Sequence, residues 1–182
     1  MRRLVGALIL LAATPVRGQE GVFLAEADAP AAVFQDADRF ERTETEATPA
    51  FRDRMRAHLG ATSPSIWEEH YVVFRAWHGG QALGLAILVD EIGKHRPISF
   101  VVGLRPDGSV EDVAVMAYRE PYGGEVRSPR FLTQYRGKGP DDRLRTHREI
   151  TNVAGATLSV DAASRAVRKA QAVAAALAGE AP

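Results

Sequence analysis

Four consecutive β-rich runs, joined by short connections, constrain the fold of this chain more than any other feature. The runs cover about 69–77, 82–90, 97–105 and 109–118. His78-Gly79-Gly80-Gln81 and Arg105-Pro106-Asp107-Gly108 lie between runs. Both are typical of tight turns, because Gly tolerates a positive φ and Pro-Asp-Gly favours a reversal. Strands that alternate with such turns form an antiparallel meander.

Helical patterns flank the β-rich region on both sides. The clearest of them begins at Thr48-Pro49, places Phe51, Met55 and Leu59 on one face, and stops at Gly60. The other expected helices cover about 25–35, 128–137 and 156–178. The predicted fold is therefore α+β, with one antiparallel β-sheet flanked by helices. The 182 residues suffice for one sizeable core and are few for two.

The first eighteen residues have the pattern of an export signal. Arg2 and Arg3 form a basic start, the stretch from Leu4 to Val16 is apolar, and Gly18 is a small residue at the expected cleavage site. The apolar stretch is shorter than the ~20 residues that a spanning helix needs, and a retained N-terminal anchor is the alternative. We therefore expect a signal peptide at 1–18, a single domain at 19–182, and a periplasmic or otherwise extracytoplasmic protein.

The composition argues against several classes of function. The 23 Lys and Arg residues balance 23 Asp and Glu residues, so a general affinity for nucleic acid is not expected. The chain has no cysteine, which excludes disulfides, thiolate metal sites and a cysteine nucleophile. Its histidines show no paired metal-ligand spacing, so no metal site is predicted. Any redox role therefore needs a cofactor.

The segment with the most chemical information is 150–159, where small residues lead directly into the last helix. Gly155 and Ala156 leave room for an anion to approach the free N–H groups and the positive end of the helix dipole. Thr157 places a hydroxyl at the same point. From the residues alone, this hydroxyl either caps the helix or is the attachment point of a phosphate ester.

Three segments, in order along the chain, resemble the FMN-binding domain family. Gly155-Ala156-Thr157-Leu158-Ser159 is similar to its Ser/Thr-Gly-Ala-Thr signature. Phe131 to Lys138 resembles its Phe-x-x-Gln-Phe-x-Gly-Lys segment, and Tyr118 to Gly124 its Glu-Thr-Pro-Gly loop. The family includes the G subunit of Rnf complexes, the C subunit of sodium-pumping NADH:quinone reductases and small exported proteins. The resemblance covers about residues 69–175.

The resemblance implies a covalent flavin. In the family, a separate FAD-dependent flavin transferase esterifies the last Thr of the signature with the phosphate of FMN, and that residue corresponds to Thr157. The expected function is extracytoplasmic electron transfer between redox partner proteins, which are membrane-bound in one version of this hypothesis. The flavin performs the redox chemistry, so no catalytic side chain is expected, and the protein is more a redox carrier than a stand-alone enzyme.

Other residues are expected to surround the flavin. Between Glu125 and Arg148 the chain has seven basic and three acidic residues, a balance suited to a phosphate or to an acidic partner. Lys138 and Arg127 are the preferred neighbours within it. A loop with Gly at its end allows close backbone approach to a ring. The full expected cofactor site is Gly155, Ala156, Thr157, Ser159, Lys138, Arg127, Glu120, Tyr122 and Gly123.

Two positions depart from the family pattern. Ala154 stands where the family has Ser or Thr, and Thr151 stands where it has Asp. These departures motivate a second hypothesis, in which the chain is an unflavinylated flavin-binding, sensor or interaction module. A flavin reductase with its own small substrate is a third possibility, disfavoured because so short a chain shows no substrate domain.

Overall fold

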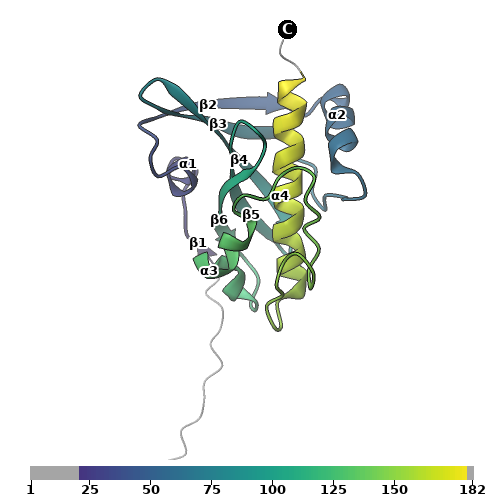
Figure 1. Ribbon diagram of the computed structural model, residues 1–182. Helices are drawn as coiled ribbons and strands as arrows, with labels where there is room; N and C mark the ends of the chain where they lie inside the picture. Colours follow the sequence, from purple (N-terminus) through teal and green to yellow (C-terminus); the bar gives the residue numbers. More distant parts are fainter. Residues whose placement is uncertain (1–20, 180–182) are drawn as a thin grey trace, which may run out of the picture.

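A six-stranded antiparallel sheet forms the centre of the computed structural model, which describes residues 21–179 (Figure 1). Across the sheet the strand order is β1-β6-β5-β4-β3-β2. The predicted α+β fold is confirmed, because the four predicted runs form β3 to β6 and pair in sequence order. The strands are β1 (Gly21–Val22), β2 (Arg39–Glu46), β3 (His70–His78), β4 (Gln81–Ile92), β5 (Pro97–Leu104) and β6 (Val110–Tyr118).

The two outer strands, β1 and β2, were not among the predicted strands. Strand β2 pairs with β3 along its whole length, from Arg39 opposite Trp77 to Glu46 opposite His70. Most of its residues are exposed, and its sequence RFERTETE lacks the apolar alternation of a half-buried strand. It is a strand because β3 offers a free edge, which local sequence patterns do not report.

The helices follow the predicted order. They are α1 (Ala29–Val33), α2 (Pro49–Leu59), α3 (Pro129–Leu132) and α4 (Thr157–Ala178), with short 3₁₀ turns η1 (Gly124–Arg127) and η2 (Thr133–Tyr135). Helices α2, α3 and α4 begin within one residue of the predicted positions, whereas α1 begins four residues after the predicted start at 25. Thr48 caps α2 as expected, since its hydroxyl accepts the N–H of Phe51 at 3.2 Å. Helices α1 and α3 are shorter than predicted.

The sheet separates two apolar clusters. Helices α2 and α4 cover one face, where Phe51, Met55 and the alanines of α4 pack against β3 to β6. Helix α1 covers the other face with Val33 and Phe34 (Figure 1). Small side chains on the buried face of α4, such as Ala163, let this helix lie close to the sheet. The first turn of α4 is thereby placed at one end of the molecule.

The predicted signal peptide, residues 1–18, lies outside the described residues and stays a prediction. The single-domain boundary at residue 19 stays a prediction for the same reason. Within residues 21–179, no helix is both long and apolar enough to span a bilayer.

Candidate functional site

Helix α4 starts without a side-chain cap. Gly155, at φ +78°, turns the chain into the helix, and Ala156 occupies the N-cap position. Among the described residues, the N–H groups of Thr157 and Leu158 have no backbone acceptor. These donors and the positive end of the helix dipole are therefore available to an anion.

The two hydroxyls of the signature have different surroundings. Thr157 is half-buried, and its Oγ1 accepts a hydrogen bond from Asn152 Nδ2 at 2.9 Å. Ser159 is buried at 4% exposure and shares a hydrogen bond of 3.1 Å with the hydroxyl of Tyr118. Thr157 is thus the hydroxyl that an external group can reach.

Thr157 lies on the edge of a cleft of about 890 Å³. This volume falls within the ~300–1,000 Å³ range of small-molecule sites. Three segments form its walls: the loop after α2, the loop before α4, and one side of α4. The lining residues are Ala61, Thr62, Ser63, Arg143, Leu144, Arg145, Thr146, His147, Thr157, Asp161, Ser164, Arg165 and Arg168.

The charged lining of this cleft is mostly basic. Four of its side chains are arginines, whereas Asp161 is its one carboxylate and accepts a hydrogen bond from the Thr146 hydroxyl. Arg143 is exposed and has no ion-pair partner within residues 21–179. It is therefore the arginine most available to a bound anion.

Two of the other arginines are held by carboxylates. The Arg145 guanidinium contacts Glu149 at 2.5 and 3.1 Å and lowers the pKa of the Glu149 carboxyl to about 2. Arg165 contacts Glu91 at 3.0 Å and the Ile92 carbonyl at 2.7 Å. These contacts order both cleft walls and neutralise part of the local charge.

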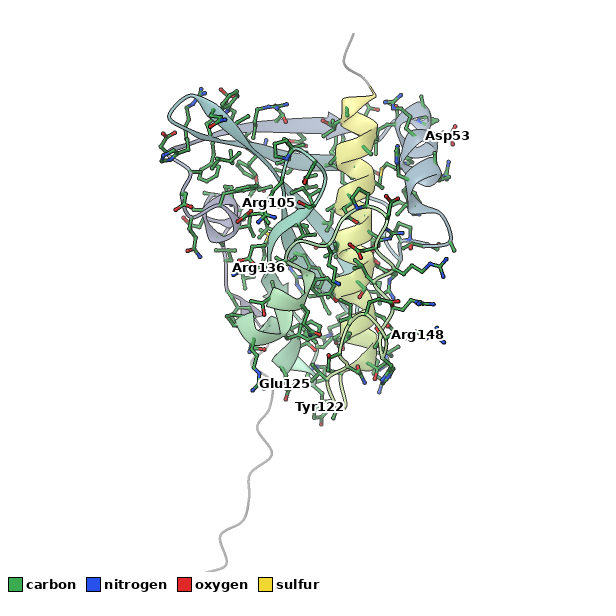
Figure 2. All side chains as sticks on the ribbon, in the orientation of Figure 1. Asp53, Arg105, Tyr122, Glu125, Arg136 and Arg148 are labelled. Carbon is green, nitrogen blue, oxygen red and sulfur yellow. The ribbon has the colours of Figure 1, made fainter. Side chains whose placement is uncertain are left out.

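The loop after β6 reaches the start of α4, as the expected site requires. A β-carbon on Gly123 would lie 3.0 Å from Ala156 Cβ and 2.9 Å from the Tyr118 hydroxyl, so only Gly fits this approach. The Tyr118 hydroxyl also donates to the Tyr122 carbonyl. The Tyr122 side chain is 71% exposed at this end of the molecule (Figure 2).

Glu120 belongs to the same loop, but its carboxylate is turned toward the connection between β4 and β5. Its Oε1 accepts the N–H groups of His95 at 2.5 Å and Arg96 at 2.8 Å. Burial on its own would raise the pKa of Glu120, but the backbone N–H groups of residues 94–96 outweigh it and the pKa is lowered. The structure thus shows a turn-stabilising contact for Glu120, and its cofactor role stays a prediction.

The structure shows other contacts for the two predicted basic neighbours of the flavin. Arg127 stacks on the ring of Phe23 at 4.1 Å from its centroid and donates to the Gly124 carbonyl. The Lys138 backbone contacts Val110 and the Gln171 side chain. Gln171 is 14 residues beyond Thr157 in α4, about 21 Å at 1.5 Å per residue. Lys138 therefore lies far from the first turn of α4, whereas Arg127 belongs to the loop that reaches this turn, and the cofactor role of both side chains stays a prediction.

The segment Phe131 to Lys138 makes hydrogen bonds to the loop before α4 and to α4 itself. Gln134 Oε1 accepts the N–H of Thr151 at 2.8 Å and so fixes the loop before α4. The Tyr135 hydroxyl bonds to Ser164 Oγ at 2.9 Å, and burial raises the pKa of this tyrosine. Both contacts hold the walls of the cleft in place.

Several cleft residues were not expected from the sequence. Arg143 and Arg145 belong to the basic stretch noted above. The sequence contained no signal that distinguished them from Lys138 or Arg127 as neighbours of the cofactor. Asp161 and Arg165 lie on the side of α4 that faces the cleft, which the helical period alone does not reveal. The loop at 61–63 carries no sequence signal at all, because its role depends on where α2 ends relative to α4.

A second cleft, of about 860 Å³, lies along the other half of α4. Its floor includes Leu85, Leu104 and Leu177, and its rim includes Arg75 and Arg105. It contains no helix N-terminus. The site at Thr157 is therefore better suited to a phosphate-bearing ligand.

Comparison with protein families identifies one family for part of the chain. The family model described as FMN-binding domain matches residues 93–172. These residues belong to the FMN-binding domain family. The match includes the loop after β6, the segment Phe131 to Lys138, the basic wall of the cleft and Thr157. No curated protein matches the chain. The predicted family is confirmed for these residues, and the match supports a flavin-binding role.

The residues at the start of α4 fit FMN. The uncapped N–H groups and Arg143 suit its phosphate, and the reachable Thr157 hydroxyl suits an ester to that phosphate. The cleft beside Thr157 has room for a planar ring system.

Proposed function

We propose that this protein is an extracytoplasmic electron-transfer protein whose FMN is joined through a phosphoester to Thr157. The observation that carries the proposal is the position of the Thr157 hydroxyl, at the uncapped start of α4 and on the edge of an arginine-lined cleft. When bound, FMN supplies the redox chemistry, and the protein holds it in a defined place.

Each residue of the site has a separate role in binding FMN. Thr157 provides the ester oxygen, and the N–H groups at the start of α4 with Arg143 stabilise the phosphate charge. Gly155 and Ala156 leave space around that phosphate. Tyr122 and Gly123 edge the ring from the neighbouring loop. No side chain acts as an acid or base in this proposal.

Export and partners complete the proposal. The signal pattern at residues 1–18 supports transport out of the cytoplasm, where a flavin transferase attaches FMN and redox partner proteins exchange electrons with it. Ala154 and Thr151 support a second candidate function, a flavin-binding or sensor module without the covalent bond.

The deciding experiment compares Thr157→Ala with Ser159→Ala in protein produced together with a flavin transferase. We expect the wild type to show the mass of one added FMN and fluorescence on a denaturing gel. Thr157→Ala should lose both signals entirely. Ser159→Ala should retain most of them, because the Ser159 hydroxyl is buried against Tyr118.

Each alternative has its own result. Labelling that survives in Thr157→Ala and disappears in Ser159→Ala would move the ester to Ser159. A wild-type chain without added mass would refute covalent attachment, and dialysis against free FMN would then test the second candidate. N-terminal sequencing of the exported protein should begin near Gln19, whereas recovery of the full chain only in membranes would contradict cleavage.

A further inference from the structure

We infer that Asn152 is a positioning residue for FMN attachment, one that holds the Thr157 oxygen in place by a donated hydrogen bond. The inference rests on the proposed function and adds a residue that the family signature does not contain. The observation behind it is the 2.9 Å contact from Asn152 Nδ2 to Thr157 Oγ1.

In the part of the chain that the structure describes, the other polar atom of the Asn152 amide is left without a hydrogen bond. This atom, Oδ1, is buried and has no hydrogen-bond partner within the described residues. An unpaired buried acceptor is unfavourable, and a side chain without it would relieve that penalty. Asn152 is thus poorly explained as a general stabiliser of the loop, whereas the bond to Thr157 gives its donor group a defined task.

The direction of the bond matters for an ester. With Nδ2 toward Thr157, the oxygen accepts and its own proton is left to point elsewhere. Rotating the amide by half a turn would make Oδ1 accept the Thr157 proton and would leave Nδ2 without a partner. Only the first arrangement persists after attachment, because an ester oxygen accepts hydrogen bonds and has no proton to donate.

The bond also restricts where the Thr157 oxygen lies. A threonine in a helix divides between two χ1 rotamers, one of which turns the hydroxyl back toward its own backbone. The contact with Asn152 selects one position of Oγ1 at the cleft edge. A nucleophile held in one position reacts faster than one that samples several.

The transfer step itself balances with FAD as the donor. Thr157 Oγ1 forms a bond to the FMN phosphorus of FAD and releases its proton to the solvent, and the bond from that phosphorus to the AMP oxygen breaks. AMP leaves with the electron pair of the broken bond. Asn152 neither gives nor takes a proton in this step, so its effect is on geometry.

The neighbouring position makes the assignment specific. Thr151 stands where the family has Asp, and its side chain is exposed while its backbone N–H bonds to Gln134. The polar contact to Thr157 comes from the next residue instead. Asn152 therefore supplies an interaction with the attachment oxygen despite the missing carboxylate at 151.

The test measures the initial rate of FMN attachment by intact mass, with purified chain, FAD and flavin transferase. Loss of one neutral hydrogen bond is worth a factor between about two and ten, and we expect Asn152→Ala and Asn152→Asp to be slower by that factor. Asp has the size of Asn but cannot donate when ionised. Thr151→Ala is the matched control and should keep the wild-type rate, because its backbone bond to Gln134 is unchanged.

A pH series separates positioning from mere packing. A protonated Asp regains a donor, so the rate of Asn152→Asp relative to wild type at the same pH should rise as the pH falls toward the carboxyl pKa. Thermal unfolding midpoints report any loss of fold separately. Wild-type rates in both Asn152 variants would overturn this inference and leave the proposed function intact. A wild-type chain that accepts no FMN would overturn both.

Discussion

Glu120 is a buried carboxylate that accepts hydrogen bonds from main-chain N–H groups of one turn. It lies next to the loop that approaches α4, yet its Oε1 binds the N–H groups of His95 and Arg96. Gly93 in the same turn leaves space for it, since a β-carbon there would lie 3.1 Å from that oxygen. At the scale of single residues, the Glu120 carboxylate therefore connects the turn after β4 to the end of β6 through its hydrogen bonds.

Glu120→Gln should lower the free energy of unfolding by about 1 kcal/mol at neutral pH, because a neutral amide accepts these hydrogen bonds less strongly than a carboxylate. The pKa of Glu120 is lowered in the folded state. Its contribution is therefore present above its unfolded pKa and disappears as the pH falls through the folded value. Denaturant unfolding of both proteins from pH 7 to pH 3 should show the difference shrinking below about pH 4.3. A difference that stays constant across this range would contradict the argument.

At the scale of elements, α4 contributes to both the candidate site and a buried cluster of charged side chains. Its first turn forms the candidate site, and Lys169, further along, is fully buried among carboxylates. The Lys169 ammonium contacts Glu68 at 2.9 Å and Glu91 at 3.1 Å, and Arg165 contacts the other oxygen of Glu91. Ser65 donates to Glu91 as well. This cluster joins α4 to β4 and to the chain that follows the cleft loop at 61–63.

Lys169→Met should destabilise the fold by about 3–5 kcal/mol, because it leaves Glu68 without its cation and the fully buried Glu91 with Arg165 alone. The measurement is denaturant unfolding followed by circular dichroism. The double variant Glu68→Gln with Lys169→Met should recover much of the loss, since Glu91 and Arg165 remain as a neutral pair. Equal stability of the single and double variants would show that charge balance is not the cause.

At the scale of the whole molecule, charge is distributed unevenly although its total is zero. Residues 26–46, which include β2, have seven acidic and two basic side chains. The stretch from Glu125 to Arg148 has seven basic and three acidic ones. Figure 1 shows β2 at one end and the start of α4 at the other, and Figure 2 shows Arg148 near the latter. Of the basic residues in this stretch, Arg143 and Arg145 line the candidate cleft and Arg148 lies near it, so this end of the molecule is basic.

This asymmetry predicts retention on a cation-exchange resin at pH 7, because a resin responds to the local field and not only to net charge. The double variant Arg143→Glu with Arg148→Glu should elute at much lower salt than the wild type. Arg39→Glu with Arg42→Glu changes the net charge by the same amount on β2 and should shift elution little. Equal shifts for the two double variants would refute a localised basic end.

Features that depend only on neighbouring residues could be predicted from the amino-acid sequence. The turns at Gly79-Gly80 and Pro106-Asp107-Gly108, the alternation of the four central strands, and the Thr48 cap all act over a few positions. The signature around Thr157 was placed correctly at a helix start, because small residues before an apolar helical period mark that start locally. These signals were enough for the α+β fold and for the family.

Contacts between groups far apart in the chain became visible only in the folded molecule. Glu68 lies 101 residues from Lys169 in the chain, so nothing local indicated that this lysine is buried. Strand β2 depends on the edge of β3, and the cleft depends on the loop at 61–63 lying opposite residues 143–147. Local patterns report backbone preference and one buried face, whereas charge pairing and cleft shape arise from packing between segments far apart in sequence. That physical difference is why the helix start at Thr157 was predictable, while the residues facing it across the cleft were not.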